Sequence, residues 1–277
     1  MKRRFFMITT DFHVAVPTAF TADEELDIEK TIHHIRFLQN QGVQSVLVCG
    51  STGEQHSLLL AEKLQILHAL EQSGLLAEME VLFGVASIRQ KEAVLLAEAV
   101  AATKVSGILL GFPAYILPSQ QQAKDYADAI ISVCPLPVIL YNNPKRTGFH
   151  LESTTLLDMV QRHTTIIGLK EAGDKKRVTE IRSQLPPDAF AFYAGGEADL
   201  AGKIAAGFDR LSSISANVLP QEIFSWFTAL LQHKEYQNKE LFTVVDTILK
   251  AESPLPKLKQ LLKENGSDVG NCRSPLK

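Results

Sequence analysis

A chain of 277 residues is long enough for one large domain or two small ones, and it can bury a core without cross-links. Apolar residues make up 45% and charged residues 21%, which excludes a disordered or collagen-like chain. The net charge of -3 leaves no basic surplus to neutralise phosphates, so we expect no nucleic-acid partner.

The cysteines and the N-terminus bear on location. Cys49, Cys134 and Cys272 are far apart and form no CxxC pair, so we expect neither a disulfide framework nor a zinc site. This usage fits a reducing cytoplasm. The basic start of the chain is followed by only a short apolar run at residues 5–8, too short for a signal peptide. No stretch of about 18 apolar residues predicts a membrane span.

Short apolar, β-branched runs alternate along the chain with longer segments of helical periodicity. Such alternation is typical of βαβ units and a parallel sheet. Eight units favour an α/β fold of the (β/α)8 TIM-barrel type over the alternative, an open doubly wound sheet. We expect the strands to begin near His13, Gln44, Met79, Ser106, Leu136, Thr165, Ala189 and Arg210.

The pattern changes after Pro220. Residues 221–264 predict two or three consecutive helices without a strand, and residues 265–277 form a polar tail. We therefore expect a barrel over residues 1–220 and a small C-terminal helical appendage with its tail over residues 221–277.

Active sites of such barrels lie at the C-terminal ends of the strands, so polar residues that follow apolar runs are candidates. The first group is Gly-Ser-Thr-Gly-Glu at 50–54, where two glycines bracket Ser51 and Thr52. Accessible backbone N–H groups and two hydroxyls suit a carboxylate or a phosphate. The alternative is a turn whose hydroxyls cap the next helix.

The second group follows the fifth strand. Tyr141 ends an apolar run, and a phenol placed at the barrel mouth can relay a proton. Arg146 can bind a carboxylate through two parallel hydrogen bonds. The alternative is a capped loop with a tyrosine in the core.

The third group is a lysine, Lys170, at the end of a continuous apolar strand. Lysine is rarely buried without a partner. With a pKa of ~10.4, about one amine in 2,500 is neutral at pH 7, and burial in a barrel lowers that pKa and increases the neutral, nucleophilic fraction. The alternative is a strand-end lysine paired with Glu171.

The remaining candidates are weaker. Gly195 and Ser212 lie at two further strand ends, where small residues leave room for a ligand. No HExxH pattern or His/Asp cluster predicts a metal site. His33 and His34 fall within one helix, and we expect both on its solvated face.

Three motifs together resemble the dihydrodipicolinate synthase / N-acetylneuraminate lyase family. They are residues 50–54, Tyr-Asn-Asn-Pro-Lys-Arg-Thr-Gly at 141–148 and Gly-Leu-Lys-Glu-Ala at 168–172, and their order and separations match too. The resemblance runs from about Val14 to Leu276. It implies a (β/α)8 barrel with a C-terminal helical domain and a homo-oligomer, a dimer or a tetramer built as a dimer of dimers. It also implies class I (lysine Schiff base) lyase or synthase chemistry on pyruvate without a metal or other cofactor.

The resemblance also implies catalytic roles. Lys170 is similar to the lysine that forms the Schiff base with pyruvate, and Tyr141 to the proton shuttle. Thr52 matches the link in the proton relay. Tyr115 aligns with the tyrosine that reaches across a dimer interface to complete this relay.

Substrate-binding roles follow in the same way. Ser51 and Thr52 match the pair that holds the pyruvate carboxylate. Arg146 is similar to the arginine that binds the carboxylate of the second substrate. Gly195 and Ser212 match positions in the wall of the site.

The sequence departs from the family pattern at several positions. Asp209 and Arg210 stand where a glycine is expected, and His56, Ile88 and Ala114 stand where lysine-sensitive members bind their effector, which predicts loss of feedback inhibition by lysine.

Arg146 favours condensation of pyruvate with aspartate semialdehyde. Ser51 gives some support to the alternative, a lyase or aldolase of N-acetylneuraminate or of a 2-keto-3-deoxy sugar acid. A third hypothesis is a catalytically silent barrel that binds a small keto acid.

Overall fold

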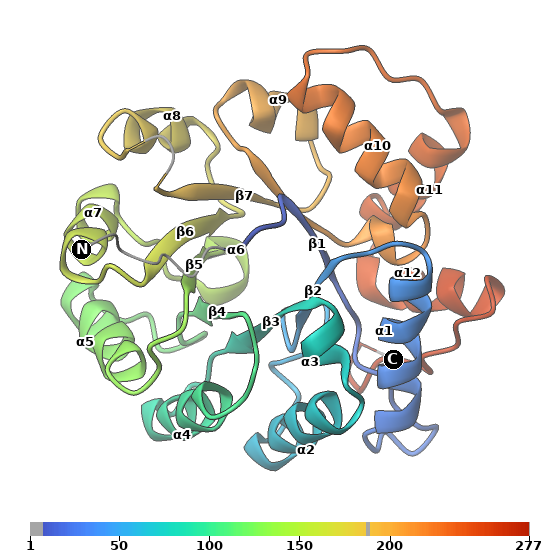
Figure 1. Ribbon diagram of the computed structural model, residues 1–277, viewed down its shortest axis with the longest axis horizontal. Helices are drawn as coiled ribbons and strands as arrows, with labels where there is room; N and C mark the ends of the chain where they lie inside the picture. The colour runs from blue at the N-terminus through green and yellow to red at the C-terminus, as the bar shows by residue number, and fades with distance from the viewer. Residues whose placement is uncertain (1–7, 187–188, 277) are drawn as a thin grey trace.

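The computed structural model describes residues 8–186 and 189–276, and its eight strands close into a parallel barrel in chain order (Figure 1). The predicted TIM barrel is therefore confirmed, and the open-sheet alternative is wrong. Each strand begins within two residues of its predicted start, with the largest differences at Leu136 against Val138 and at the seventh strand. The strands are β1 (Phe12–Ala15), β2 (Ser45–Val48), β3 (Glu80–Val85), β4 (Gly107–Gly111), β5 (Val138–Asn142), β6 (Ile166–Glu171), β7 (Ala191–Gly195) and β8 (Arg210–Ser213).

Helices surround the barrel and extend beyond it at the C-terminal end of the chain (Figure 1). Local sequence sets several of their starts: the Asp27 side chain accepts the N–H of Lys30 at 2.9 Å, and Ser119 forms a capping box with Gln122. The helices are α1 (Ile28–Asn40), α2 (Leu60–Gln72), α3 (Leu75–Glu78), α4 (Gln90–Ala101), α5 (Gln120–Ile131), α6 (Pro144–Thr147), α7 (Ser153–Arg162), α8 (Lys176–Arg182), α9 (Leu200–Ala205), the 3-10 helix η1 (Ser215–Asn217), α10 (Pro220–Leu231), α11 (Lys239–Leu249) and α12 (Pro254–Glu264).

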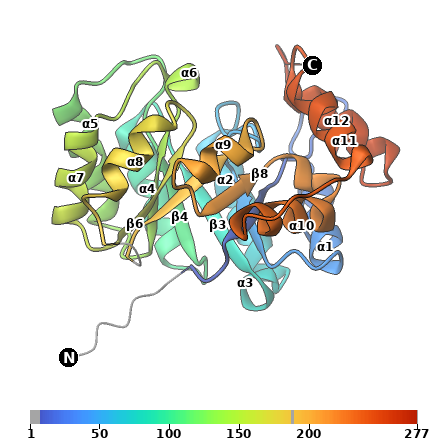
Figure 2. The ribbon, with the colours of Figure 1, turned by 90° about the horizontal axis from the view of Figure 1, so that it is seen from above.

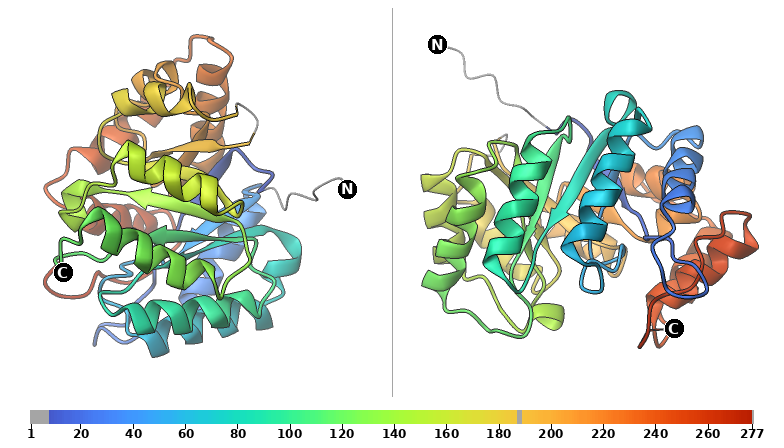
Figure 3. Two further views of the ribbon diagram at one scale, coloured as in Figure 1. Left: turned by 90° about the vertical axis from the view of Figure 1, so that its left-hand side faces the viewer. Right: turned by 90° about the horizontal axis from the view of Figure 1, so that it is seen from below.

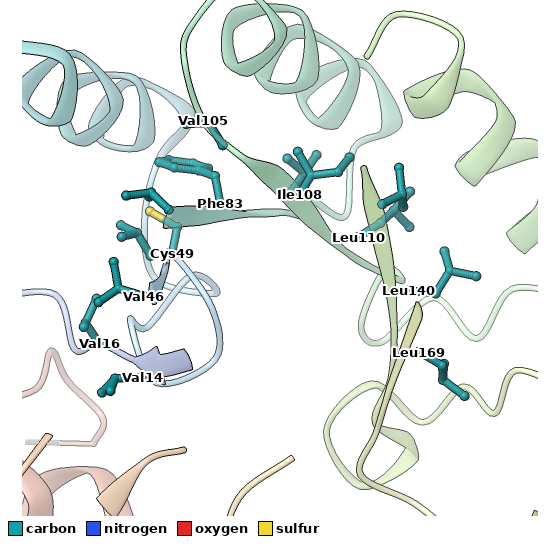
Figure 4. Close-up of a cluster of buried hydrophobic side chains, with 14 of the residues drawn as sticks. Val14, Val16, Val46, Cys49, Phe83, Val105, Ile108, Leu110, Leu140 and Leu169 are labelled. Atoms are coloured by element: carbon teal, nitrogen blue, oxygen red, sulfur yellow. The ribbon is translucent and has the colours of Figure 1, made fainter. Parts of the chain in front are cut away.

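Every second strand residue points outward and packs beneath the helices, which explains why the strands read as continuous apolar runs. Figure 4 shows this cluster, which includes Val46, Phe83, Leu110, Leu140 and Leu169. The burial of this layer between sheet and helices accounts for most of the hydrophobic stabilisation of the barrel.

Inward-facing side chains fill the barrel in layers. Because the strands tilt, side chains at one height come from alternate strands. The register places one layer on the even strands and the next layer beneath it on the odd strands. The layer nearer the C-terminal ends of the strands contains Leu47, Leu109, Lys170 and Ser212. The layer below it contains His13, Leu82, Ile139 and Tyr193.

The C-terminal helices form a separate apolar cluster that includes Leu255, Leu258 and Leu262 of α12 and also Ala19 from the loop after β1. The right-hand view of Figure 3 shows α11 and α12, in red, projecting at one side of the barrel. In Figure 2 both these helices and α6 lie toward the top of the view, on opposite sides. The division at residue 220 stays a prediction.

Within residues 8–186 and 189–276, no helix is both long and apolar enough to traverse a lipid bilayer. The short apolar run at the start of the chain falls mostly on residues 1–7, outside the described residues.

Candidate active site

Lys170 lies in β6 on the inner face of the barrel, with 6% of its surface exposed. Its Nζ donates a hydrogen bond of 2.7 Å to Oγ of Ser212 and lies 4.8 Å from the centroid of the Tyr141 ring. The adjacent strands β5 and β6 pair Tyr141 with Lys170 in register, which fixes this approach. The amine therefore faces a hydroxyl and an aromatic ring in a largely dry environment.

Burial governs the charge of this amine. Desolvation lowers the pKa of Lys170 to about 7; Glu197 opposes the shift and Arg146 adds to it. An amine with this pKa is about half neutral at pH 7, a gain of ~1,000-fold over an exposed lysine. Lys170 can therefore act as a nucleophile at neutral pH.

The alternative pairing of Lys170 with Glu171 is wrong. Successive strand residues point to opposite faces, so Glu171 points away from the barrel interior. Its carboxylate accepts hydrogen bonds from Asn142 at 2.8 and 2.9 Å and from Arg177 at 3.1 Å. The carboxylate is thus satisfied on the helix side of the sheet.

The Tyr141 hydroxyl accepts a hydrogen bond of 2.7 Å from Nδ2 of Asn143. Asn143 itself is buried, so this contact fixes the phenol oxygen at the end of β5. The sequence prediction named Tyr141 but missed Asn143 as its partner, although the two asparagines that directly follow Tyr141 in the sequence were the signal. The phenol proton stays free to be donated to a ligand.

The turn at residues 50–54 follows β2 at the same end of the barrel. The Ser51 and Thr52 side chains make no hydrogen bond to any part of the chain that the structure describes. They do not cap α2, because Leu59 precedes that helix and its N–H is bound by Glu62 at 2.7 Å. The capping alternative is wrong, and both hydroxyls are available to a ligand.

Arg146 and Tyr115 lie farther out. Arg146 is exposed on α6. Burial is the main cause of the lowered pKa of both Lys170 and His56, and the positive charge of Arg146 lowers both pKa values further. Tyr115 is 90% exposed in the loop after β4 and has a φ of 72°. Its N–H donates to the carbonyl of Thr147 at 3.3 Å, which ties its loop to α6. The single chain does not bring the Tyr115 side chain into contact with Lys170.

Gly195 and Ser212 flank Lys170 from β7 and β8. A Cβ atom at position 195 would lie 3.1 Å from Cβ of Ala172 and 3.6 Å from Cε of Lys170, so glycine leaves space beside the lysine. Ser212 is 2% exposed and accepts the hydrogen bond from Lys170. It therefore orients the amine, a closer role than the wall position expected.

Two buried residues near Lys170 were missed by sequence analysis. Glu197 accepts the N–H groups of Ile214 at 3.2 Å and Ser215 at 3.1 Å, which anchors the end of β8. His13 packs beneath Lys170 with its ring centroid 5.3 Å from that of Tyr193, and neither ring nitrogen has a partner. Burial and then the charge of Lys170 lower the pKa of His13, so this imidazole is neutral.

The expectation that His34 lies on a solvated face is wrong. Its Nδ1 lies 2.8 Å from Oγ of Ser267 and its Nε2 lies 2.9 Å from Oδ1 of Asn217. The face of α1 that carries Ile35 and Leu38 is buried, and His34 belongs to that face. The histidine thereby joins α1 to η1 and the C-terminal tail, and burial lowers its pKa to about 4.

This burial predicts a loss of stability in acid. An exposed histidine in the unfolded chain takes up its proton near pH 6.5, before the folded protein does, so the contribution of His34 is lost as the pH falls from 6.5 to 4. Its size is about 3 kcal/mol. We expect the free energy of unfolding of His34→Gln to vary less with pH over this interval, as measured by urea denaturation.

The exposed His68 provides the control. The His68→Gln protein is expected to keep the pH dependence of the wild type. An unchanged pH dependence in His34→Gln would show that this histidine is not held neutral.

Comparisons with known proteins identify the family of the chain. A family model described as the dihydrodipicolinate synthetase family matches residues 9–277. A 4-hydroxy-tetrahydrodipicolinate synthase from Nostoc punctiforme is 30% identical over 268 residues, which cover 95% of this chain and 90% of that protein.

Solved structures are similar throughout. A dihydrodipicolinate synthase from Bacillus anthracis has a TM-score of 0.85 and 27% identity, covering 96% of this chain and 91% of that one. A 2-keto-3-deoxygluconate aldolase from Sulfolobus has a TM-score of 0.82, covering 96% and 89%; at 23% identity this likeness shows the fold alone. The chain belongs to the dihydrodipicolinate synthetase family.

Proposed function

We propose that this protein is a class I lyase that condenses pyruvate with aspartate semialdehyde, as a 4-hydroxy-tetrahydrodipicolinate synthase. The observation that carries the proposal is the buried amine of Lys170, bonded to Ser212 and placed beside the Tyr141 ring. The names of the relatives support the same reaction.

The chemistry follows from a neutral amine. Lys170 attacks the keto carbon of pyruvate, and the resulting carbinolamine loses water to give an iminium ion. The iminium withdraws electrons, so the methyl group loses a proton and becomes an enamine. The enamine carbon attacks the aldehyde of the second substrate, whose oxygen takes up a proton. The amino group of that substrate then attacks the iminium carbon, which closes the ring of the product and releases the amine of Lys170.

The surrounding residues divide this work. Tyr141 moves protons to and from the carbinolamine, with Thr52 as the next member of the relay. Ser51 and Thr52 bind the pyruvate carboxylate through their hydroxyls and backbone N–H groups. Arg146, exposed at the mouth, binds the carboxylate of the aldehyde substrate.

Further residues shape the substrate site and connect it to a second copy of the chain. Gly195 provides space beside the lysine, and Ser212 orients it. Tyr115 completes the relay from a second copy, since it lies in an exposed apolar group with Ile116 and Leu117. We therefore propose a homo-oligomer, a dimer or tetramer, with small molecules as its other partners. Its three cysteines are free, in keeping with a cytoplasmic location.

The pH profile tests the state of the lysine. Because the neutral amine is the nucleophile and its pKa is about 7, kcat/KM for pyruvate should rise up to ~10-fold per pH unit below 7 and level off above it. Initial rates between pH 5.5 and 9, at pH values where the fold is intact by circular dichroism, give the midpoint. A rate still rising above pH 9 would mean that the amine is solvated.

The choice of second substrate is tested by turnover. The purified protein is supplied with pyruvate and aspartate semialdehyde, and separately with N-acetylneuraminate and 2-keto-3-deoxygluconate. We expect kcat/KM for aspartate semialdehyde to exceed the values for cleavage of the sugar acids. The reverse order would favour the sugar-acid lyase. Binding of pyruvate without exchange of its methyl protons would favour a silent barrel.

A further inference from the structure

The turn that carries Ser51 and Thr52 ends in a fully buried carboxylate. Glu54 is 0% exposed and has a φ of 54°, a left-handed conformation that is uncommon for a residue with a side chain. Such a conformation persists only where surrounding contacts hold it. The contacts that hold Glu54 come from the far end of the chain.

Lys259 of α12 supplies the opposite charge. Its Nζ lies 2.8 Å from Oε1 of Glu54, and both side chains are at most 2% exposed. The same ammonium donates hydrogen bonds to the carbonyls of Thr18 at 2.8 Å and Asn271 at 2.9 Å. It also lies 4.6 Å from the centroid of the Phe20 ring. Its charge is thus fully compensated inside the protein.

The second oxygen of Glu54 is also held. The N–H of Arg273 donates to Oε2 at 3.0 Å, and the Arg273 guanidinium donates to the carbonyl of Ser57 at 2.9 Å. Both ends of the segment 54–57 are therefore fixed by the C-terminal tail.

The loop after β1 closes the arrangement. Oγ1 of Thr18 donates to the carbonyl of Gly53 at 2.7 Å, while the Thr18 carbonyl accepts from Lys259. The turn is tightly packed at Gly53, because a Cβ atom there would lie 3.2 Å from each of three atoms, in Val16, Thr18 and Cys49. A shift of Lys259 is therefore transmitted to the turn from two sides.

We propose that Lys259 is a positioning residue for the carboxylate subsite, which acts by fixing Glu54 and thereby the hydroxyls and N–H groups of Ser51 and Thr52. The inference rests on the proposed function in one respect: the ligand of this turn is the carboxylate of a 2-keto acid. Lys259 itself does not touch the substrate, since its buried ammonium forms an ion pair with Glu54 and donates hydrogen bonds to the carbonyls of Thr18 and Asn271.

This role predicts a specific kinetic effect. The carboxylate of pyruvate is bound alike in the ground state and in the transition states, so a loosened turn mainly raises KM, while the displacement of Thr52, a member of the proton relay, lowers kcat by a smaller factor. For Lys259→Met we expect KM for pyruvate to rise about 10-fold to 100-fold, with a fall in kcat of less than about tenfold. A disturbance of Lys170 itself would instead lower kcat by more than it raises KM.

The variants are chosen to separate positioning from folding. Lys259→Met leaves Glu54 as a buried unpaired charge, which itself destabilises the fold. The double variant Lys259→Met/Glu54→Gln removes both charges and is expected to regain thermal stability while KM stays raised. Lys263→Met, on the same helix but exposed, is the matched control and should keep the KM of the wild type.

A second measurement does not depend on turnover. Amide hydrogen exchange of residues 50–57 in the ligand-free protein should be faster in Lys259→Met and in the double variant, and unchanged in Lys263→Met. If the wild type does not use pyruvate, the proposed function fails, while the exchange data still test whether Lys259 holds the turn at residues 50–57 in place. Unchanged exchange, or an unchanged KM in the folded double variant, would overturn the role of Lys259.

Discussion

Replacing Lys170 by arginine is expected to abolish condensation, with a fall in kcat of at least ~10⁴-fold. The guanidinium of arginine keeps its proton at every pH at which the protein is folded, so it cannot attack a keto carbon. Much of the side-chain volume is retained while the neutral, nucleophilic form is lost, so the fall in kcat reports on nucleophilicity in a protein that still folds. The measurement is turnover of pyruvate with aspartate semialdehyde, with circular dichroism to verify folding.

The matched control is Lys176→Arg, because Lys176 is exposed at the start of α8. This variant should have the kcat of the wild type. Retention of more than about a hundredth of the wild-type kcat in Lys170→Arg would assign the chemistry to another group.

Removing the phenol oxygen in Tyr141→Phe should lower kcat by about 10² to 10³-fold, the usual contribution of a positioned proton donor. The ring that lies 4.8 Å from Nζ of Lys170 is retained, so the environment of the amine changes little. Exchange of the pyruvate methyl protons into deuterated water, followed by NMR, should slow in parallel, because formation of the enamine needs the same proton transfers.

Tyr126 provides the comparison for this variant. Its hydroxyl bonds to the backbone of Ser87 behind the barrel wall, at 3.0 and 3.1 Å. Tyr126→Phe should lose about 1 kcal/mol of stability and keep its kcat. Equal kcat values for Tyr141→Phe and the wild type would remove the phenol from the mechanism.

Much of the barrel could be predicted from local patterns. Apolar runs that are buried on both faces alternate with amphipathic helices, and each unit is complete within a short stretch of chain. Lys170 could be predicted in the same way, because a lysine at the C-terminal end of an apolar strand lies at the mouth of the barrel. Its two partners, Tyr141 and Ser212, also end strands.

Residues with distant partners could not be predicted in this way. Lys259 binds the carbonyl of Thr18, 241 positions away. The spacing of Leu255, Leu258 and Leu262 places position 259 on the buried face of α12, but it does not identify the partners of this lysine. His34 was misplaced because its partners, Asn217 and Ser267, belong to segments that pack on α1 only in the folded protein. Such contacts depend on topology rather than on neighbouring residues.

The role of Tyr115 was predicted on different grounds. Its prediction came from a resemblance, and the folded chain leaves it 90% exposed. A role in the proton relay requires a second copy of the chain to cover it, so neither the local sequence nor one chain can complete this part of the site.

The proposed mechanism requires the amine of Lys170 to form the Schiff base with pyruvate. Incubation with pyruvate and sodium borohydride, followed by peptide mass spectrometry, tests it most directly. We predict a reduced pyruvyl adduct on the peptide that contains Lys170 and none on the half-buried Lys203, whose Nζ donates to the carbonyl of Gly196. An unmodified Lys170, or equal labelling of other lysines, would exclude Lys170 as the residue that forms the Schiff base.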